Sequence, residues 1–193
     1  MTKRCFTLAL KKTIPVFLGY ITCGIAFGLV LVNAGYPWWF ATAMSVIIFA
    51  GAAQFAAVPL FVAGTPIYLI LLTELLLNIR HIVYGLPLIS QFKKCGKWRP
   101  YLIFALSDET FSLLSTTDVP EDVPIGSFFG AIAALDQFYW VLGTTIGALI
   151  GAMIPFDMTG VDFSLTALFA VLTIDQFSKF LKKNNKETEN DCN

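Results

Sequence analysis

The stretch FAGAAQFAAVPLF, residues 49–61, lies in the middle of a long apolar segment but is poorly suited to an uninterrupted helix. It places small residues from Gly51, the polar Gln54 and then Pro59 at the depth where a spanning helix would be most regular. Glycine weakens a helix and proline removes a backbone donor. Irregular backbone is tolerated within a bilayer only where protein or a wet cavity covers it. The stretch therefore predicts a broken or re-entrant helix within residues 38–63.

The chain as a whole has a composition typical of membrane proteins. Of its 193 residues, 56% are apolar and 18 are phenylalanine, and the mean hydropathy is +0.72. A spanning helix needs about 20 mainly apolar residues. About six segments approach that length, namely residues 13–34, 38–63, 66–90, 101–115, 125–154 and 163–181. We expect an all-α, polytopic integral membrane protein with one transmembrane domain at residues 1–181 and a polar, disordered tail at residues 182–193.

Basic residues form three clusters, at residues 3–12, 93–99 and 179–186. The positive-inside rule expects all three on the cytoplasmic side. If each of the first three segments crosses once, however, residues 93–99 lie outside. Two re-entrant segments, 38–63 and 101–115, entering from opposite faces, remove the conflict and leave four full crossings. The alternative is six ordinary spans with one basic loop that violates the rule.

The segment at residues 66–90 contains polar side chains in an otherwise apolar run. They recur at spacings of four and three, at Glu74, Asn78, His81 and Tyr84. This spacing stacks them on one helix face. Arg80 either points into the protein interior or extends its aliphatic stem to reach the interface. His81 either handles protons near neutral pH or is a hydrogen-bonded packing residue.

The segment at residues 101–115 is short and carries the sequence SDET near its centre. Two neighbouring carboxylates, Asp108 and Glu109, are hard to ionise together at membrane depth, so one is expected to bind a proton. The alternative is that they pair with Arg80 or cap a helix end.

Asp136 lies near the middle of the segment at residues 125–154, with Tyr139 and Trp140 one turn further on. A carboxylate beside an aromatic wall is typical of a small-molecule pocket. The same pattern also fits an acid next to ordinary packing aromatics. Further along, Gly143, Gly147 and Gly151 form a smooth helix face, which allows close contact either with a partner or within the protein.

Several function classes lack support. The sequences GxxxxGK[ST], HExxH and GxSxG are absent, so we expect neither ATP hydrolysis nor an enzyme with these nucleophile or metal motifs. One histidine and four scattered cysteines predict no metal site. With 13 basic and 13 acidic residues, the chain has no global basic field for nucleic acid. Discontinuous helices with buried polar groups favour a secondary carrier.

The ordered motifs FAGAAQF, NIRHIVYG, LSDETF, LDQFYWVLGTTIGALIG and VDFSLTALF resemble those of the AzlC family, over residues 14–172. The resemblance implies export of branched-chain amino acids together with a small AzlD-type membrane protein. It also implies further hydrophobic segments beyond the last motif, where this chain has its polar tail. The family's polar signature maps to Gly51, Gln54, Asn78, Arg80, His81, Asp108, Glu109, Trp140, Asp162 and Phe163.

We therefore expect a multi-pass protein of a prokaryotic plasma membrane that exports branched-chain or similar apolar amino acids, driven by an ion gradient. The alternative is an assembly subunit without its own solute pathway, which holds a partner through the glycine face. The expected substrate-binding residues are Gly51, Gln54, Asn78, Arg80, Tyr139 and Trp140, with Phe55 beside them. The expected proton-coupling residues are His81, Asp108, Glu109 and Asp136.

Overall fold

The computed structural model describes residues 3–120 and 122–154, and this part of the chain is helical and contains no strands. Its elements are α1 (Lys3–Asn33), α2 (Trp38–Ile47), α3 (Gly51–Val62), α4 (Ile67–Asn78), α5 (Arg80–Phe92), η1 (Lys93–Trp98), α6 (Arg99–Phe104), α7 (Asp108–Thr116) and α8 (Ile125–Met153). The all-α prediction is confirmed. The predicted segment 163–181, the tail 182–193 and the signature residues Asp162 and Phe163 lie outside the described residues.

Two described helices are each long and apolar enough to cross a membrane by themselves. They are α1, with 31 residues, and α8, with 29 residues. A third candidate span consists of α4 followed by the stretch Arg80–Phe104, with a bend of 42° between the two parts. These three candidates overlap the first, third and fifth segments expected from hydropathy, and the third candidate extends beyond residue 90 into the fourth segment.

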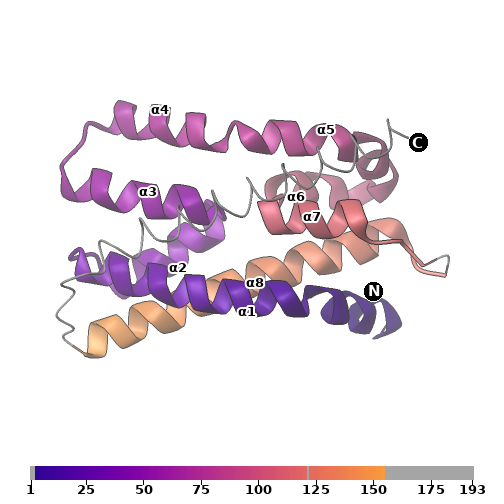
Figure 1. The fold of residues 1–193 in the computed structure, drawn as a ribbon, viewed down its shortest axis with the longest axis horizontal. Coiled ribbons are helices and arrows are strands. Elements are labelled where there is room, and N and C mark those ends of the chain that lie inside the picture. Colours follow the sequence, from indigo (N-terminus) through magenta and orange to yellow (C-terminus); the bar gives the residue numbers. More distant parts are fainter. Residues whose placement is uncertain (1–2, 121, 155–193) are drawn as a thin grey trace, which may run out of the picture. The chain divides into compact units, whose positions relative to one another are not determined.

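The second segment is broken, as the small residues and Gln54 predict. α2 ends at Ile47 and α3 begins at Gly51, and α3 doubles back to the end of the molecule at which α2 began (Figure 1). The connection requires a left-handed backbone at Phe49, with φ 44°, which is uncommon for a bulky residue. This hairpin does not continue across the bundle.

The fourth segment is broken in the same way from the opposite end. α6 stops at Phe104, α7 starts at Asp108, and both run between the right-hand end and the middle of the view (Figure 1). Ser107 caps α7 because its side chain accepts a hydrogen bond from the Thr110 amide at 3.1 Å. The prediction that segments 38–63 and 101–115 are broken is thus confirmed, and their entry from opposite faces of a membrane stays a prediction.

The third segment is also interrupted, so the residues predicted to share one face of a single helix are divided between α4 and α5. α4 and α5 meet at Ile79, between Asn78 and His81. The imidazole Nδ1 of His81 donates to the Asn78 carbonyl at 3.0 Å, and the Ile82 amide bonds the Ile79 carbonyl at 3.1 Å. This tightened i→i+3 turn replaces regular helical bonding at the bend.

Two of the basic clusters lie at the same end of the described bundle. Arg4, in the first cluster, pairs with Asp122 just before α8, with an N···O distance of 2.8 Å. Cys95, in the second, packs its backbone against Gly126 in the first turn of α8. Residues of both clusters thus lie beside the start of α8, as the positive-inside rule expects of two clusters on one side of the membrane.

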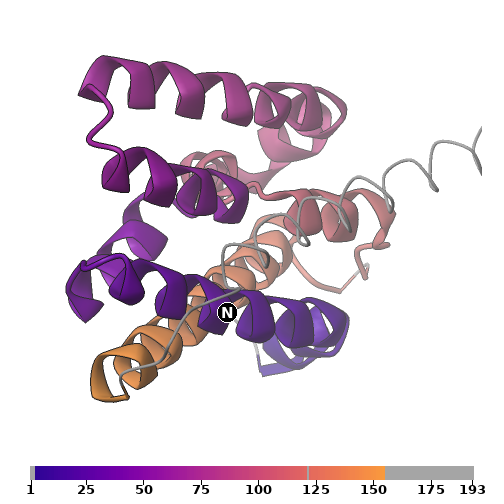
Figure 2. The same cartoon turned by 60° about the vertical axis from the view of Figure 1, so that its left-hand side comes forward.

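The core of the described part is the contact between α1 and α8. The two chains run in the same direction, and the helix axes cross at an oblique angle (Figure 2). Small residues let the two backbones meet. A Cβ added to Gly143 would lie 2.9 Å from the Ile21 carbonyl oxygen, and one added to Gly24 would lie 2.9 Å from the Thr144 nitrogen. The predicted glycine face is therefore occupied by α1, so internal packing is the alternative that the structure supports.

Candidate functional site

The breaks of the three interrupted helices meet around one cavity of about 230 Å³. Its lining comes from the α2–α3 break, the α4–α5 bend and the α6–α7 break, and consists of Ile48, Phe49, Ala50, Asn78, His81, Ile103, Phe104 and Leu106. Six of the eight lining residues have apolar side chains. Asn78 and His81 supply its polar side chains.

The break between α2 and α3 also contributes unpaired backbone to this region. α3 begins with Ala50 in the N-cap position, so no side chain caps its first turn. The first N–H groups of a helix have no partner within the helix, and they favour an anion. Gly51, predicted to bind substrate, opens this turn.

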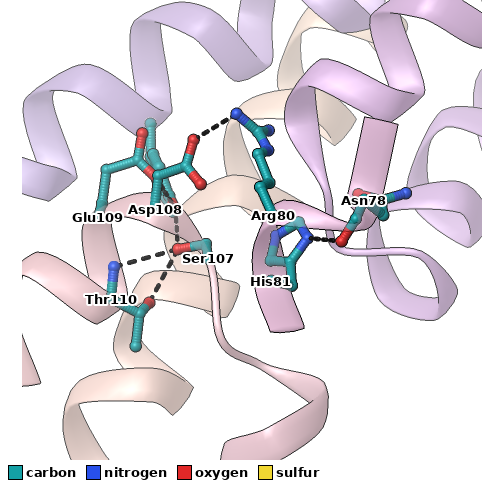
Figure 3. A network of polar contacts seen from close by, with 8 residues as sticks. Asn78, Arg80, His81, Ser107, Asp108, Glu109 and Thr110 are labelled. Carbon is teal, nitrogen blue, oxygen red and sulfur yellow. Dashed lines mark hydrogen bonds and ion pairs between the residues drawn. The ribbon is translucent and has the colours of Figure 1, made fainter. Parts of the chain in front are cut away.

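Arg80 and Asp108 face each other beside the cavity, as Figure 3 shows. The guanidinium Nη1 lies 2.7 Å from the Asp108 Oδ2, and the two side chains are 28% and 29% exposed. Arg80 Nε and Asp108 Oδ1 are buried and have no partner among the described residues. Of the alternatives for Arg80, the structure supports the inward-facing one, paired with Asp108.

A chain of hydroxyl groups connects the other two predicted acids. The Tyr20 hydroxyl lies 2.7 Å from Glu109 Oε2 and 2.7 Å from Ser107 Oγ. Ser107 Oγ lies 3.0 Å from Thr110 Oγ1, which donates to Asp136 Oδ2 at 2.8 Å. Figure 3 shows the Ser107 and Thr110 part of this chain.

The two ends of the hydroxyl chain have different surroundings. Asp136 is completely buried, and its Oδ1 has no partner among the described residues. Glu109 is exposed. The chain thus joins the surface of the described part to its core.

Gln54 and Trp140 lie in a closed polar network away from the cavity lining. The Trp140 indole donates to Gln54 Oε1 at 2.7 Å, and Gln54 Nε2 donates to Ser45 Oγ at 3.0 Å. Gln54 is completely buried. Glycine at position 51 also makes room for this network, because a Cβ there would lie 2.9 Å from the Trp140 ring.

The remaining predicted residues are also distributed between cavity and core. Tyr139 is buried, its hydroxyl lies 3.2 Å from Thr13 Oγ1 and its ring packs edge-on against Phe17. Phe55 is buried against Phe27. Asn78 and His81 line the cavity, whereas Gln54, Tyr139 and Trp140 form part of the packed interior.

Several residues of this site escaped the sequence analysis. Tyr20 lies among ordinary apolar residues of α1 and has no local signal, although it joins Glu109 to Ser107. Thr110 belongs to the SDET motif, so the sequence shows that it has polar neighbours. The sequence does not show that it bonds Asp136. The described residues contain no cluster of three or more His, Cys, Asp or Glu side chains that could hold a metal ion.

The chain is similar to known membrane proteins. The family model described as AzlC protein matches residues 15–154. The Branched-chain amino acid transport protein AzlC of Bacillus subtilis strain 168 is 38% identical over 175 residues, which cover 90% of this chain and 68% of that protein.

Two further relatives are named as membrane proteins. An Uncharacterized membrane protein of Helicobacter pylori strain 26695 is 38% identical over 94% of this chain and 80% of its own length. The Inner membrane protein YgaZ of Escherichia coli K12 is 30% identical over 88% of this chain and 72% of its own length. No solved structure matches the chain.

Proposed function

The chain belongs to the AzlC family, and we propose that it exports branched-chain or similar apolar amino acids, driven by a proton gradient and assisted by a small membrane partner. It is a multi-pass membrane transport protein of a prokaryote. The solute, the direction, the coupling ion and the partner are the proposed parts.

The observation that carries this proposal is the cavity at the meeting point of three helix breaks. Secondary carriers place solutes near the membrane midplane, where discontinuous helices offer free backbone groups and half-helix dipoles. A volume of about 230 Å³ lies below the ~300–1,000 Å³ typical of drug-sized ligand sites. The cavity therefore suits a solute as small as an amino acid.

The cavity also has the chemistry of such a solute. The uncapped first turn of α3, from Ala50 to Gly51, is suited to the carboxylate. Asn78 and His81 offer polar contacts for the ammonium group. Phe49, Leu106 and the other apolar lining residues suit an aliphatic side chain.

Two acids outside the cavity supply groups for proton coupling. Glu109 is exposed and is joined through hydroxyl groups to the buried Asp136. Protons that enter the cell through such groups would drive solute outward in exchange. Arg80, paired with Asp108 next to the cavity, is the second candidate for recognition of the solute carboxylate.

Efflux of radiolabelled valine and isoleucine from preloaded cells tests the function. We expect faster efflux with the gene than without it, loss of that gain when a protonophore collapses the proton gradient, and a further gain on co-expression of the small partner. Equal efflux with and without the gene, at confirmed membrane abundance and with the partner present, would refute the proposed export.

A matched pair of variants tests the cavity. Asn78→Leu removes a polar lining group and should raise the half-saturation concentration for the solute. Thr73→Val removes a hydroxyl on the same helix that bonds only the Leu69 carbonyl at 2.9 Å, so transport should remain at the wild-type level. Unchanged half-saturation in Asn78→Leu would exclude the cavity as the binding site.

A further inference from the structure

The hydroxyl chain between Glu109 and Asp136 contains too few protons for its contacts. It has four oxygen–oxygen contacts, at 2.7, 2.7, 3.0 and 2.8 Å. All four distances fit O–H···O hydrogen bonds, each of which needs one proton. Tyr20, Ser107 and Thr110 each have a single hydroxyl proton. If both end carboxyls are ionised, one contact is left without a hydrogen.

One additional proton completes the chain, and it can sit at either end. With the proton on Glu109, that acid donates to Tyr20, and the three hydroxyls donate onward to Ser107, Thr110 and finally Asp136. With the proton on Asp136, every donor reverses. The two arrangements differ only by a shift of one proton within each contact, so no bond other than O–H changes.

No Lys, Arg or His side chain of the described residues forms an ion pair with Glu109 or Asp136. The titratable or charged groups near the two carboxyls are Tyr20 and Cys23 on α1, Arg80 and Tyr84 on α5, Tyr101 on α6 and Asp108 on α7. Of these groups on the described helices, Arg80 is the cation, and it is paired with Asp108 at 2.7 Å. A buried carboxylate without a paired cation is costly.

We propose that Glu109 and Asp136 share one proton, which passes between the exposed and the buried carboxyl along the hydroxyls of Tyr20, Ser107 and Thr110. Asp136 thereby stores the proton in the core, and Glu109 exchanges it with water. The use of this proton in transport rests on the proposed function. The existence of the shared proton and its path along the hydroxyl groups are independent of that function.

Infrared spectroscopy of the full chain in liposomes measures both claims without any transport. The carbonyl stretch of a protonated carboxyl reports the stored proton. Near neutral pH, the wild-type spectrum minus that of the double variant Glu109→Gln/Asp136→Asn should contain one protonated carboxyl per chain. A difference of none or of two protonated carboxyls overturns the shared proton.

Exchange into heavy water tests the path. The carboxyl band should shift rapidly in the wild type, because the relay connects Asp136 with the surface. Thr110→Val and Tyr20→Phe each remove one relay hydroxyl and keep the shape of the side chain, so exchange should slow by about tenfold or more, as expected when a hydrogen bond is lost from the path. Wild-type exchange rates in both variants overturn the relay.

Thr13→Val is the matched control, because Thr13 is as completely buried as Thr110 and its hydroxyl bonds outside the relay. Its band should shift as fast as that of the wild type. Equally slowed exchange in this control would contradict the relay, since loss of any buried hydroxyl would then suffice.

Transport measurements separate this inference from the proposed function. An intact one-proton signal with slowed exchange in the relay variants, in a protein that moves no amino acid, would refute the function and leave the relay. Coupled efflux that survives in Thr110→Val and Tyr20→Phe with wild-type exchange would refute the relay and leave the function.

Discussion

The glycine series on α8 offers a direct test of the core contact, because two of its members differ in their surroundings. A Cβ on Gly147 would overlap the Ile25 carbonyl oxygen and lie 2.6 Å from the Ile25 Cα, both backbone atoms. A Cβ on Gly151 would lie 3.4 Å from the Leu29 Cδ2 and 3.5 Å from the Val32 Cβ, which is ordinary contact. Alanine should therefore be harmful at the first position and acceptable at the second.

The size of each effect follows from two opposing contributions. Alanine improves on glycine in a helix interior by about 0.8–1.0 kcal/mol at either position. Overpacking costs about 1–3 kcal/mol, and Gly147→Ala should reach the upper half because backbone cannot rotate away. Gly147→Ala is thus expected to lower the free energy of unfolding by about 1–2 kcal/mol, and Gly151→Ala to leave it unchanged or raise it by up to about 1 kcal/mol.

Equilibrium unfolding in mixed micelles with increasing denaturing detergent, followed by circular dichroism, measures the difference. The two variants should be separated by about 2 kcal/mol, or roughly 30-fold in the unfolding equilibrium. Equal destabilisation by both substitutions, or a larger loss in Gly151→Ala, would refute the register of α1 against α8 on which this reasoning depends.

The same unfolding assay tests the two polar contacts of the interior. Gln54→Met leaves the Trp140 indole N–H without its acceptor and should lower the free energy of unfolding by about 1–3 kcal/mol. In a double-mutant cycle with Trp140→Phe, we expect a coupling energy of at least about 0.5 kcal/mol. Additive effects of the two substitutions would contradict the contact. Arg80→Met leaves Asp108 unpaired and should cost about 1–3 kcal/mol, less than for a fully buried pair because these side chains are partly exposed. The double variant Arg80→Met/Asp108→Asn should recover most of that loss, and a double variant as unstable as Arg80→Met would exclude the pairing.

The helix breaks show how far local sequence reasoning extends. Around Gly51 and around Asp108, small or polar residues interrupt an apolar run, and the penalty for exposing such backbone to lipid made both breaks predictable. The bend at Ile79 also lies among polar residues, but their regular spacing suggested one continuous helix. At the bend, the His81 side chain bonds the Asn78 carbonyl and Arg80 contacts Asp108 on another helix.

The candidate site divides in the same way. Asn78, Arg80, Asp108 and Glu109 were recognisable because charge and hydrogen-bonding capacity are costly within a membrane. Tyr20 and the apolar residues of the cavity carried no signal, because a tyrosine or a leucine in an apolar helix is ordinary. Gln54 and Trp140 are residue types that can bind a solute, which is why they were predicted to do so. Their mutual hydrogen bond and their burial place them in the packed interior.

The sequence by itself determined the helical class, the membrane location, the two broken segments and the set of polar residues that must be shielded from lipid. These follow from local composition, because desolvation costs and backbone preferences act residue by residue. Only the tertiary structure decided which glycines meet α1, that three breaks share one cavity, and that Tyr20 completes a hydroxyl chain from Glu109 to Asp136. Each of these depends on the register between helices far apart in the chain, which packing sets and no local pattern encodes.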